Sequence, residues 1–226
     1  MTGWRGWASG RRLWLTGGLW LLALLSTYAW WWMRADWPWT PFDDKYSTVI
    51  AGIVPTLSGA IALYGILPGL DWVDLQAVTR PQLRDTAAAT LIVVAFAALP
   101  PLIRWLLTLD AFYLRFVPEN ILAEPESPQW VAQFWGLGLE TGFVIGATCL
   151  MTGLLGRLLG PLMGIVCYSG LLTIQGYRLM PLTFPRLGDV RSGLSLVAAA
   201  LVVVLGLAAF RLSRSGARPL IGRMLP

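Results

Sequence analysis

The sequence contains no histidine and only two cysteines. Without histidine, a bis-histidine haem site, Ser/His proteolysis and acyl or phosphoryl transfer by a histidine base each lose a required group. Cys149 and Cys167 lie in separate apolar runs and form no Cys-x-x-Cys pair. We therefore expect both thiols to be buried as small apolar side chains. The sequence predicts no catalytic residue, no cofactor and no metal site.

Charged residues are also scarce, at 13% of 226 residues against 56% hydrophobic residues. A chain with so few charges cannot cover an ordinary water-exposed surface, so lipid is the solvent that suits it. Six apolar runs approach the roughly 20 residues that a helix needs to cross a bilayer. We expect an all-α polytopic membrane protein with six transmembrane helices, forming a single transmembrane domain over residues 1–226. The predicted spans are residues 13–33, 47–67, 86–107, 130–155, 158–176 and 192–210.

The first twelve residues combine three arginines with two tryptophans, which predicts a short interfacial helix before the first span. A cleaved signal peptide is the alternative. The first apolar run is long, however, and ends in Trp30, Trp31 and Trp32, where cleavage requires small residues. We therefore expect the first span to be retained as an anchor.

The distribution of charge predicts the orientation of the chain. Placing both termini in the cytoplasm puts ten of the 17 Lys and Arg residues inside and eight of the twelve acids outside. The positive-inside rule favours this N-in/C-in arrangement, which requires an even number of spans. Arginines at the ends of apolar runs also indicate contact with anionic lipid, and the sequence predicts no nucleic-acid partner.

Prolines and glycines distinguish the spans from one another. Pro100 and Pro101, near the outer end of the third span, predict a kink or break there. Glycines recur at every fourth position in the fourth and fifth spans, at Gly138, Gly142, Gly146, Gly156, Gly160 and Gly164. Small residues at this spacing let helix backbones approach closely. We expect tight helix packing, within the chain or against a second subunit.

Glu140 is the acid placed well inside a predicted span. Because a carboxylate is costly in hydrocarbon, Glu140 is a candidate for a translocation path, a proton site or a hydrogen bond between subunits. The alternative is a position close enough to the outer interface, or to a water-filled vestibule, for water to solvate it. We expect the hydroxyl groups of Thr141, Thr148 and Thr152 on the same span to bond back to their own helix.

Residues 68–86 form the most charged internal segment on the predicted cytoplasmic side. The segment carries Asp71, Trp72, Asp74, Arg80 and Arg84 between two apolar runs. The chain has no Gly-x-x-x-x-Gly-Lys-Ser/Thr loop, so any ATP must be hydrolysed by a partner.

Two segments resemble the exporter-type, ABC-2-like permease subunits of bacterial ABC transporters, especially the small tryptophan-, alanine- and arginine-rich ones of actinobacteria. Gly69–Leu75 followed by Thr79–Arg84 is similar to the segment between the second and third spans of that family. Gly153–Leu162 is similar to the tight inner turn between its fourth and fifth spans. The first segment has fewer arginines than is usual in the family, and the N-terminal region is very short.

The resemblance implies a multi-pass subunit of the bacterial cytoplasmic membrane that is not itself an enzyme. It implies two partners, a cytoplasmic ATP-binding subunit and a second permease of the same or similar kind, and a hydrophobic or amphipathic substrate such as a drug, peptide or lipid. By this resemblance Tyr177–Arg191 would re-enter the outer leaflet, and the ATPase would be contacted by Asp71, Trp72, Asp74, Arg80 and Arg84. The alternative is a non-catalytic scaffold or accessory subunit of another membrane complex, in which the glycine faces serve only for packing.

Overall fold

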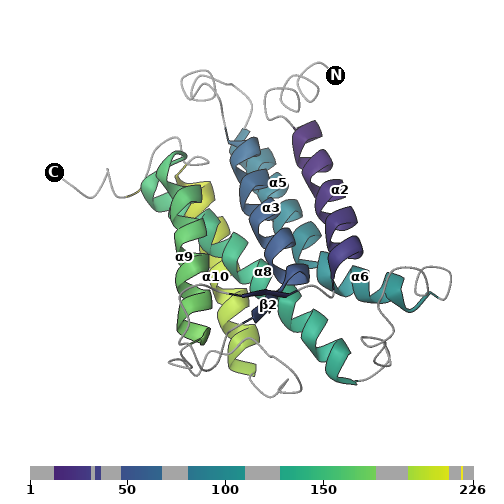
Figure 1. The fold of residues 1–226 in the computed structure, drawn as a ribbon. Helices are drawn as coiled ribbons and strands as arrows, with labels where there is room; N and C mark the ends of the chain where they lie inside the picture. Colours follow the sequence, from purple (N-terminus) through teal and green to yellow (C-terminus); the bar gives the residue numbers. More distant parts are fainter. Residues whose placement is uncertain are drawn as a thin grey trace.

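The computed structural model describes residues 13–31, 34–36, 47–67, 81–109, 128–176, 193–213 and 220. These ranges are almost wholly helical (Figure 1), and the predicted all-α class is confirmed. The helices are α2 (Leu13–Trp30), α3 (Ile50–Ile66), α5 (Pro81–Ala97), α6 (Leu99–Leu107), α8 (Pro128–Leu155), α9 (Leu159–Gly176) and α10 (Gly193–Leu212).

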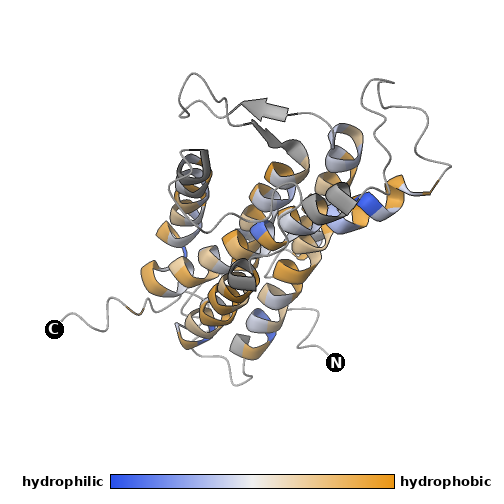
Figure 2. Cartoon of the chain, turned by 90° about the horizontal axis from the view of Figure 1, so that it is seen from below, coloured by the Kyte–Doolittle hydropathy of each residue, from blue (hydrophilic) through white to orange (hydrophobic). Residues whose placement is uncertain are grey.

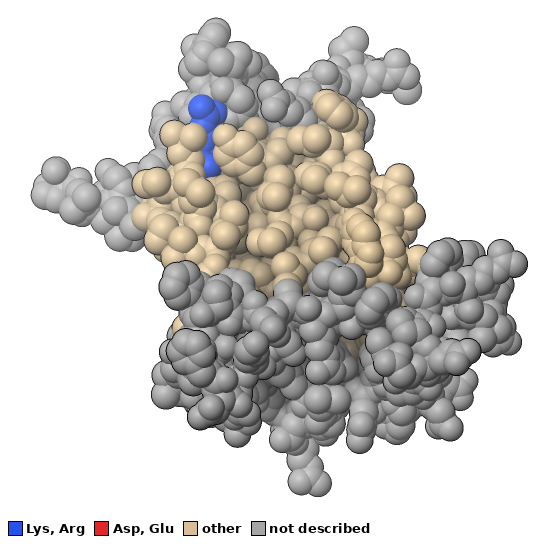
Figure 3. All heavy atoms as spheres, in the orientation of Figure 1, with Lys and Arg blue, Asp and Glu red and all other residues tan. Residues whose placement is uncertain are grey.

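Three helical segments are long and apolar enough to cross a membrane, at Leu13–Trp30, Leu83–Leu107 and Phe134–Leu155. Three shorter apolar helices accompany them, at Ala51–Ile66, Leu159–Gly170 and Leu196–Leu212. The described helices are coloured mainly as apolar in Figure 2, and on the face that Figure 3 shows, the described residues are almost all uncharged. These features are those of an α-helical membrane protein.

Helix α8 is the longest helix and packs against α3, α5, α6, α9 and α10. Helix α2 lies on the far side of α3 from α9 (Figure 1). The largest apolar cluster joins α2, α3, α5, α8 and α10, with Phe96, Phe210 and Leu63 among its fully buried side chains. Because α8 contacts so many neighbours, its polar residues Glu140, Thr141, Thr148 and Thr152 are all buried.

The third predicted span bends at its two prolines, as the sequence indicates. Helix α5 ends at Ala97, Ala98 forms a turn, and α6 begins at Leu99 and runs in a different direction (Figure 1). Pro100 and Pro101 have no amide hydrogen and cannot complete the helical ladder, which explains the bend. The predicted break is confirmed, and we call this bend the α5–α6 elbow. By contrast, α3 continues through Pro55 without interruption.

The sequence analysis predicted helices and did not include two short strands that the structure contains. β1 (Arg34–Asp36) pairs antiparallel with β2 (Ser47–Val49), with Arg34 opposite Val49 and Asp36 opposite Ser47. β2 takes the first three residues of the predicted second span, so α3 begins only at Ile50.

The two cysteines differ in their surroundings. Cys149 on α8 is buried, as expected, but Cys167 on α9 is exposed on the outside of the helix bundle. The prediction was therefore wrong for Cys167, because apolar residues in a membrane helix can face lipid as readily as a protein core. The predicted interfacial helix at residues 1–12 and the segment Tyr177–Arg191 lie outside the described residues.

Candidate functional site

Glu140 lies on α8 within the segment Phe134–Leu155, which is long and apolar enough to span a membrane. The residue is only 4% exposed, and its Oε1 atom has no hydrogen-bond partner in the part of the chain that the structure describes. A buried polar group without a partner costs free energy, so a protein retains one mainly where it serves a purpose. Among the described residues, Glu140 is therefore enclosed by protein.

Tyr168 on α9 is a second buried polar residue near Glu140. Its side chain is 3% exposed, and its hydroxyl group lies near Glu140 and Thr56. Among the described residues, the Tyr168 hydroxyl oxygen has no hydrogen bond of good geometry. Two buried polar groups from neighbouring helices therefore have unused hydrogen-bonding capacity.

Two threonines complete this group. Thr56 on α3 and Thr141 on α8 are fully buried, and their hydroxyl oxygens lie 3.0 Å apart. Thr56 donates its hydroxyl hydrogen to the carbonyl oxygen of Gly52 at 2.7 Å. Because a hydroxyl group has one hydrogen to donate, Thr141 is then the donor to Thr56. We name Thr56, Glu140, Thr141 and Tyr168 the polar cluster.

The glycines of α9 explain how Tyr168 reaches this place. Gly160 packs on Thr152 of α8 and Gly164 packs on Thr148, both so closely that a β-carbon would overlap with α8. Tyr168 follows at the same four-residue interval, so it lies on the same face of α9. The two helices run antiparallel, and the next step along α8 is Val144, which packs with Tyr168. The close approach at Gly160 and Gly164 thus brings the tyrosine onto α8 one turn from Glu140.

The cluster combines a carboxyl group, a phenol and two aliphatic hydroxyls in an otherwise apolar interior. Such groups can take up or release a proton and can form hydrogen bonds with a polar group that passes them. No group of three or more Cys, Asp or Glu residues suited to a metal ion occurs among the residues that were described.

The hydroxyl groups of the three threonines on α8 have different kinds of hydrogen-bond partner. The hydroxyls of Thr148 and Thr152 donate to the carbonyls of Val144 and Thr148, at 2.8 and 2.7 Å, as predicted. Thr141 instead bonds across the helix interface to Thr56, so the prediction of a bond within its own helix was wrong for this residue. The close packing of α3 on α8 provides a partner that the sequence of α8 alone does not reveal.

Gly138, Gly142 and Gly146 of the fourth span pack against Ala97 and Val203. An ideal β-carbon on Gly138 would lie 2.6 Å from the carbonyl oxygen of Ala97, whereas one on Gly142 would lie 3.5 Å from the β-carbon of Ala97. A β-carbon on Gly146 would lie 2.8 Å from Cγ2 of Val203 on α10. All these neighbours belong to the same chain.

Gly156 is part of the turn between α8 and α9. It lies between α8 and α9 with φ at 87°, a backbone conformation that glycine adopts at little cost. Gly156 is therefore part of the inner turn between these helices, while Gly160 and Gly164 form the packing face on α9.

The predicted ATPase-coupling residues fall largely outside the described residues. This applies to Asp71, Trp72, Asp74 and Arg80, whereas Arg84 is found in the first turn of α5. The helix ends that flank residues 68–80, namely the end of α3 and the start of α5, lie at the upper end of the molecule in Figure 1. Helix ends at this upper end carry described charged residues, namely Arg84 and Asp85 at the start of α5, Arg157 in the turn between α8 and α9, and Arg211 near the end of α10.

The sequence identified Glu140 but missed Thr56 and Tyr168. Thr56 is 85 residues from Thr141, and no local pattern connects positions so far apart. The one usable signal was the four-residue glycine spacing in α9, which places Tyr168 on the face that contacts α8.

No protein family, curated protein or solved structure was found to match this chain. The resemblance to exporter permeases therefore stays a hypothesis that rests on the segments Gly69–Arg84 and Gly153–Leu162.

Proposed function

We propose that this chain is the membrane subunit of an ATP-driven exporter of the bacterial cytoplasmic membrane. In this proposal six helices cross the bilayer, both termini are cytoplasmic, and a separate ATP-binding subunit supplies the energy. The substrate is a hydrophobic or amphipathic compound, which passes between two permease subunits. The observation that carries the proposal is the charged end of the molecule, where the helix ends that flank residues 68–80 lie.

The charged end supports the orientation. Arg84, Arg157 and Arg211 come from three separate parts of the sequence, yet their helix ends lie together with the start of α2 (Figure 1). The positive-inside rule assigns such an end to the cytoplasm. The amide of Leu220 also donates to the carbonyl of Gly153 at 3.1 Å, which keeps this part of the C-terminal segment at the same end.

The coupling role follows from that orientation. The segment of residues 68–80 joins two helix ends on the proposed cytoplasmic side, where an ATPase can reach it. Trp72 supplies an apolar anchor, and the nearby acids and arginines supply a polar rim, a composition typical of residues that dominate binding energy. Movement of the ATPases on binding ATP would then rock the two permease subunits against each other.

The face formed by α3 and α9 is the proposed contact with the second permease. An apolar groove of about 340 Å³ lies between these helices, and its lining residues are Ala60, Ile61, Tyr64, Leu158, Pro161, Leu162 and Ile165. Helices α3 and α9 also carry Thr56 and Tyr168, so a path along this face would pass beside the polar cluster. The polar cluster could then bind a polar group of the substrate or exchange a proton during transport.

Copurification with a cytoplasmic ATPase tests the coupling role. The variant Trp72→Ala/Arg80→Glu is expected to lose the ATPase and its stimulation, because the anchor and a rim charge are both removed. Arg115→Glu, on the predicted outer side, is the control and should keep both. If the double variant retains the full complex and its stimulated ATPase rate, the assignment of this loop is wrong. If the purified native chain carries no ATPase at all, the accessory-subunit alternative is favoured.

Cross-linking tests the permease interface. In a Cys167→Ala background, Leu162→Cys on the α3–α9 face is expected to give a linked dimer with a short bifunctional maleimide. Val204→Cys is the matched control, because Val204 is 65% exposed on α10, on another face, and Leu162 is 60% exposed. Equal cross-linking at both positions, or none at Leu162→Cys, would remove this face from the proposal.

A further inference from the structure

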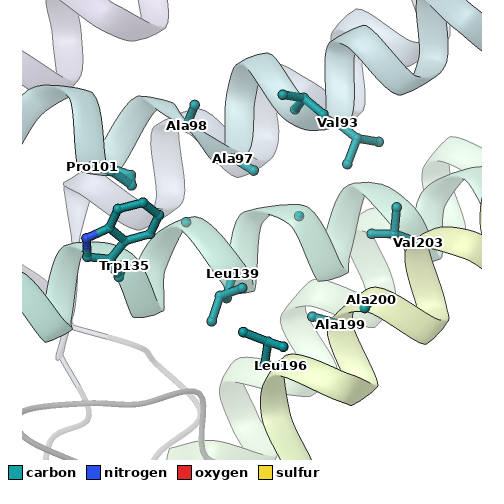
Figure 4. Close-up of a pocket in the computed structure, with 13 residues that line it drawn as sticks. Val93, Ala97, Ala98, Pro101, Trp135, Leu139, Leu196, Ala199, Ala200 and Val203 are labelled. Carbon is teal, nitrogen blue, oxygen red and sulfur yellow. The ribbon is translucent and has the colours of Figure 1, made fainter. Parts of the chain in front are cut away.

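A second apolar groove runs along α8, between α5 and α10 (Figure 4). Its volume is about 400 Å³, and α5, the α5–α6 elbow and α10 form its walls. The floor consists of small residues, Gly138 and Gly142 on α8 with Ala97 and Ala199 on either side. Larger side chains, such as Trp135 and Leu196, stand at the rim and are more than half exposed. The groove is therefore narrow and open to the surroundings of the helix bundle.

The groove is long enough to hold part of an acyl chain within one leaflet of a bilayer. From Trp135 to Gly142 along α8 the groove covers seven residues, which is about 10 Å at the rise of an α-helix. One leaflet of the hydrocarbon core is roughly 15 Å deep. A linear acyl chain lying in this groove would therefore run from the interface towards the middle of the membrane.

A cation lies near one end of the groove, one helical turn beyond its lining. Pro101 lines the groove beside Trp135 (Figure 4), and Arg104 is three residues further along α6, so the two side chains are neighbours on the helix surface. Arg104 is partly exposed, although its Nε atom is buried and has no hydrogen-bond partner within the described ranges. A guanidinium group suits an anionic oxygen, above all a phosphate.

Helix α6 places this cation at the level where lipid headgroups lie. One side of α6 is buried through Leu99, Pro100, Ile103 and Leu107, while Arg104 and Trp105 lie on other sides. A short amphipathic helix that leaves the direction of its span is typical of the membrane interface. Tryptophans such as Trp105 and Trp135, each more than half exposed, are enriched at the same level.

We propose that this groove binds an anionic phospholipid of the surrounding bilayer, with one acyl chain on Gly138 and Gly142 and the phosphate on Arg104. The apolar groove alone would accept an acyl chain of any lipid, and Arg104 near its end selects an anionic headgroup. The lipid belongs to the leaflet on the α6 side. The site does not depend on the exporter role, since it uses neither the polar cluster nor the α3–α9 face.

Native mass spectrometry of the detergent-purified full chain tests the site, with phosphatidylglycerol and phosphatidylcholine as probes. The native protein is expected to retain one phosphatidylglycerol about fivefold more strongly than phosphatidylcholine, the preference that one arginine near a membrane surface confers. Arg104→Gln should bind the two lipids equally. Arg211→Gln, at the other end of the molecule, should keep the native preference.

Two tryptophan variants on α10 test the groove itself. Ala200→Trp fills the groove from its exposed wall and should abolish retention of both lipids, whereas Val204→Trp lies outside the groove and should leave retention unchanged. The proposal is overturned if the native protein shows no headgroup preference or if both tryptophan variants retain lipid equally. A loss of dimers in Ala200→Trp with lipid retention unchanged would assign the groove to a second copy of the chain and would also overturn it.

Discussion

Ala97 directs its backbone carbonyl oxygen at Gly138, 2.6 Å from the place where a β-carbon on that glycine would stand. Pro101 occupies the position that would normally donate to this carbonyl, and proline has no amide hydrogen. The oxygen is therefore turned to the neighbouring helix, where the Cα–H of a glycine is a weak but available donor. One proline and one glycine from different spans together make the elbow fit against α8.

Gly138→Ala is expected to destabilise the protein by about 1–3 kcal/mol, because the added methyl group meets backbone that cannot move aside. Gly142→Ala is the control, since its β-carbon would make an ordinary 3.5 Å contact. The control also gains about 1 kcal/mol of helix propensity and should be at least as stable as the native chain. Thermal unfolding in detergent measures both, and a Gly138→Ala protein as stable as Gly142→Ala would contradict the observed packing.

Thr141→Val should weaken the protein by about 0.6 kcal/mol, the mean value for hydrogen bonds between membrane helices. Thr148→Val is the matched control, because the Thr148 hydroxyl bonds only within its own helix. A double-mutant cycle with Thr56→Val isolates the contact, since the coupling energy of the two changes reports their interaction. A coupling energy of zero in denaturant titrations would mean that the 3.0 Å contact contributes nothing to stability.

Glu140→Met is expected to raise stability by about 1–3 kcal/mol, because it removes a buried oxygen that has no partner and keeps the volume of the side chain. The same variant should lower the stimulated ATPase rate of the assembled complex if the carboxyl group serves transport. Leu139→Met, a change of similar size on the next residue, controls for the introduced methionine in both measurements. A less stable Glu140→Met protein would show that a group outside the described ranges satisfies the carboxyl.

The proposed orientation predicts which side of the membrane each loop faces. In a Cys167→Ala background, Asp43→Cys should react with a membrane-impermeant maleimide in intact cells. Asp74→Cys should react only after the membrane is permeabilised, because the charged end faces the cytoplasm. Labelling of Asp74→Cys in intact cells would reverse the topology and place the proposed coupling loop beyond the reach of an ATPase.

The helices were predictable because hydropathy and proline are local signals. Each of the six apolar runs contains a described helix. The third run contains two, α5 and α6, and Pro100 with Pro101 marks the elbow between them. The pairing of β1 with β2 was not predictable, since a three-residue strand gains its stability from the partner segment and not from its own sequence. Whether all six helices cross the bilayer stays a prediction, as three of them meet the criterion of length and composition.

The candidate site was predictable only in part. A carboxylate in an apolar run is conspicuous, so Glu140 could be named from the sequence. Thr56 and Tyr168 look like ordinary residues of a membrane helix, and only the packing of α3 and α9 on α8 brings them to Glu140. The lipid groove was also hidden, because its floor and walls come from segments that are distant in sequence.

Helix α3 contains 17 residues, which corresponds to a hydrophobic thickness of about 26 Å. In the six-span arrangement this side of the molecule falls short of a typical hydrocarbon core of roughly 30 Å. The bilayer would have to compress next to this helix, at a small elastic cost for each ångström of mismatch. In a membrane of mixed composition, the protein should therefore gather in the thinner regions.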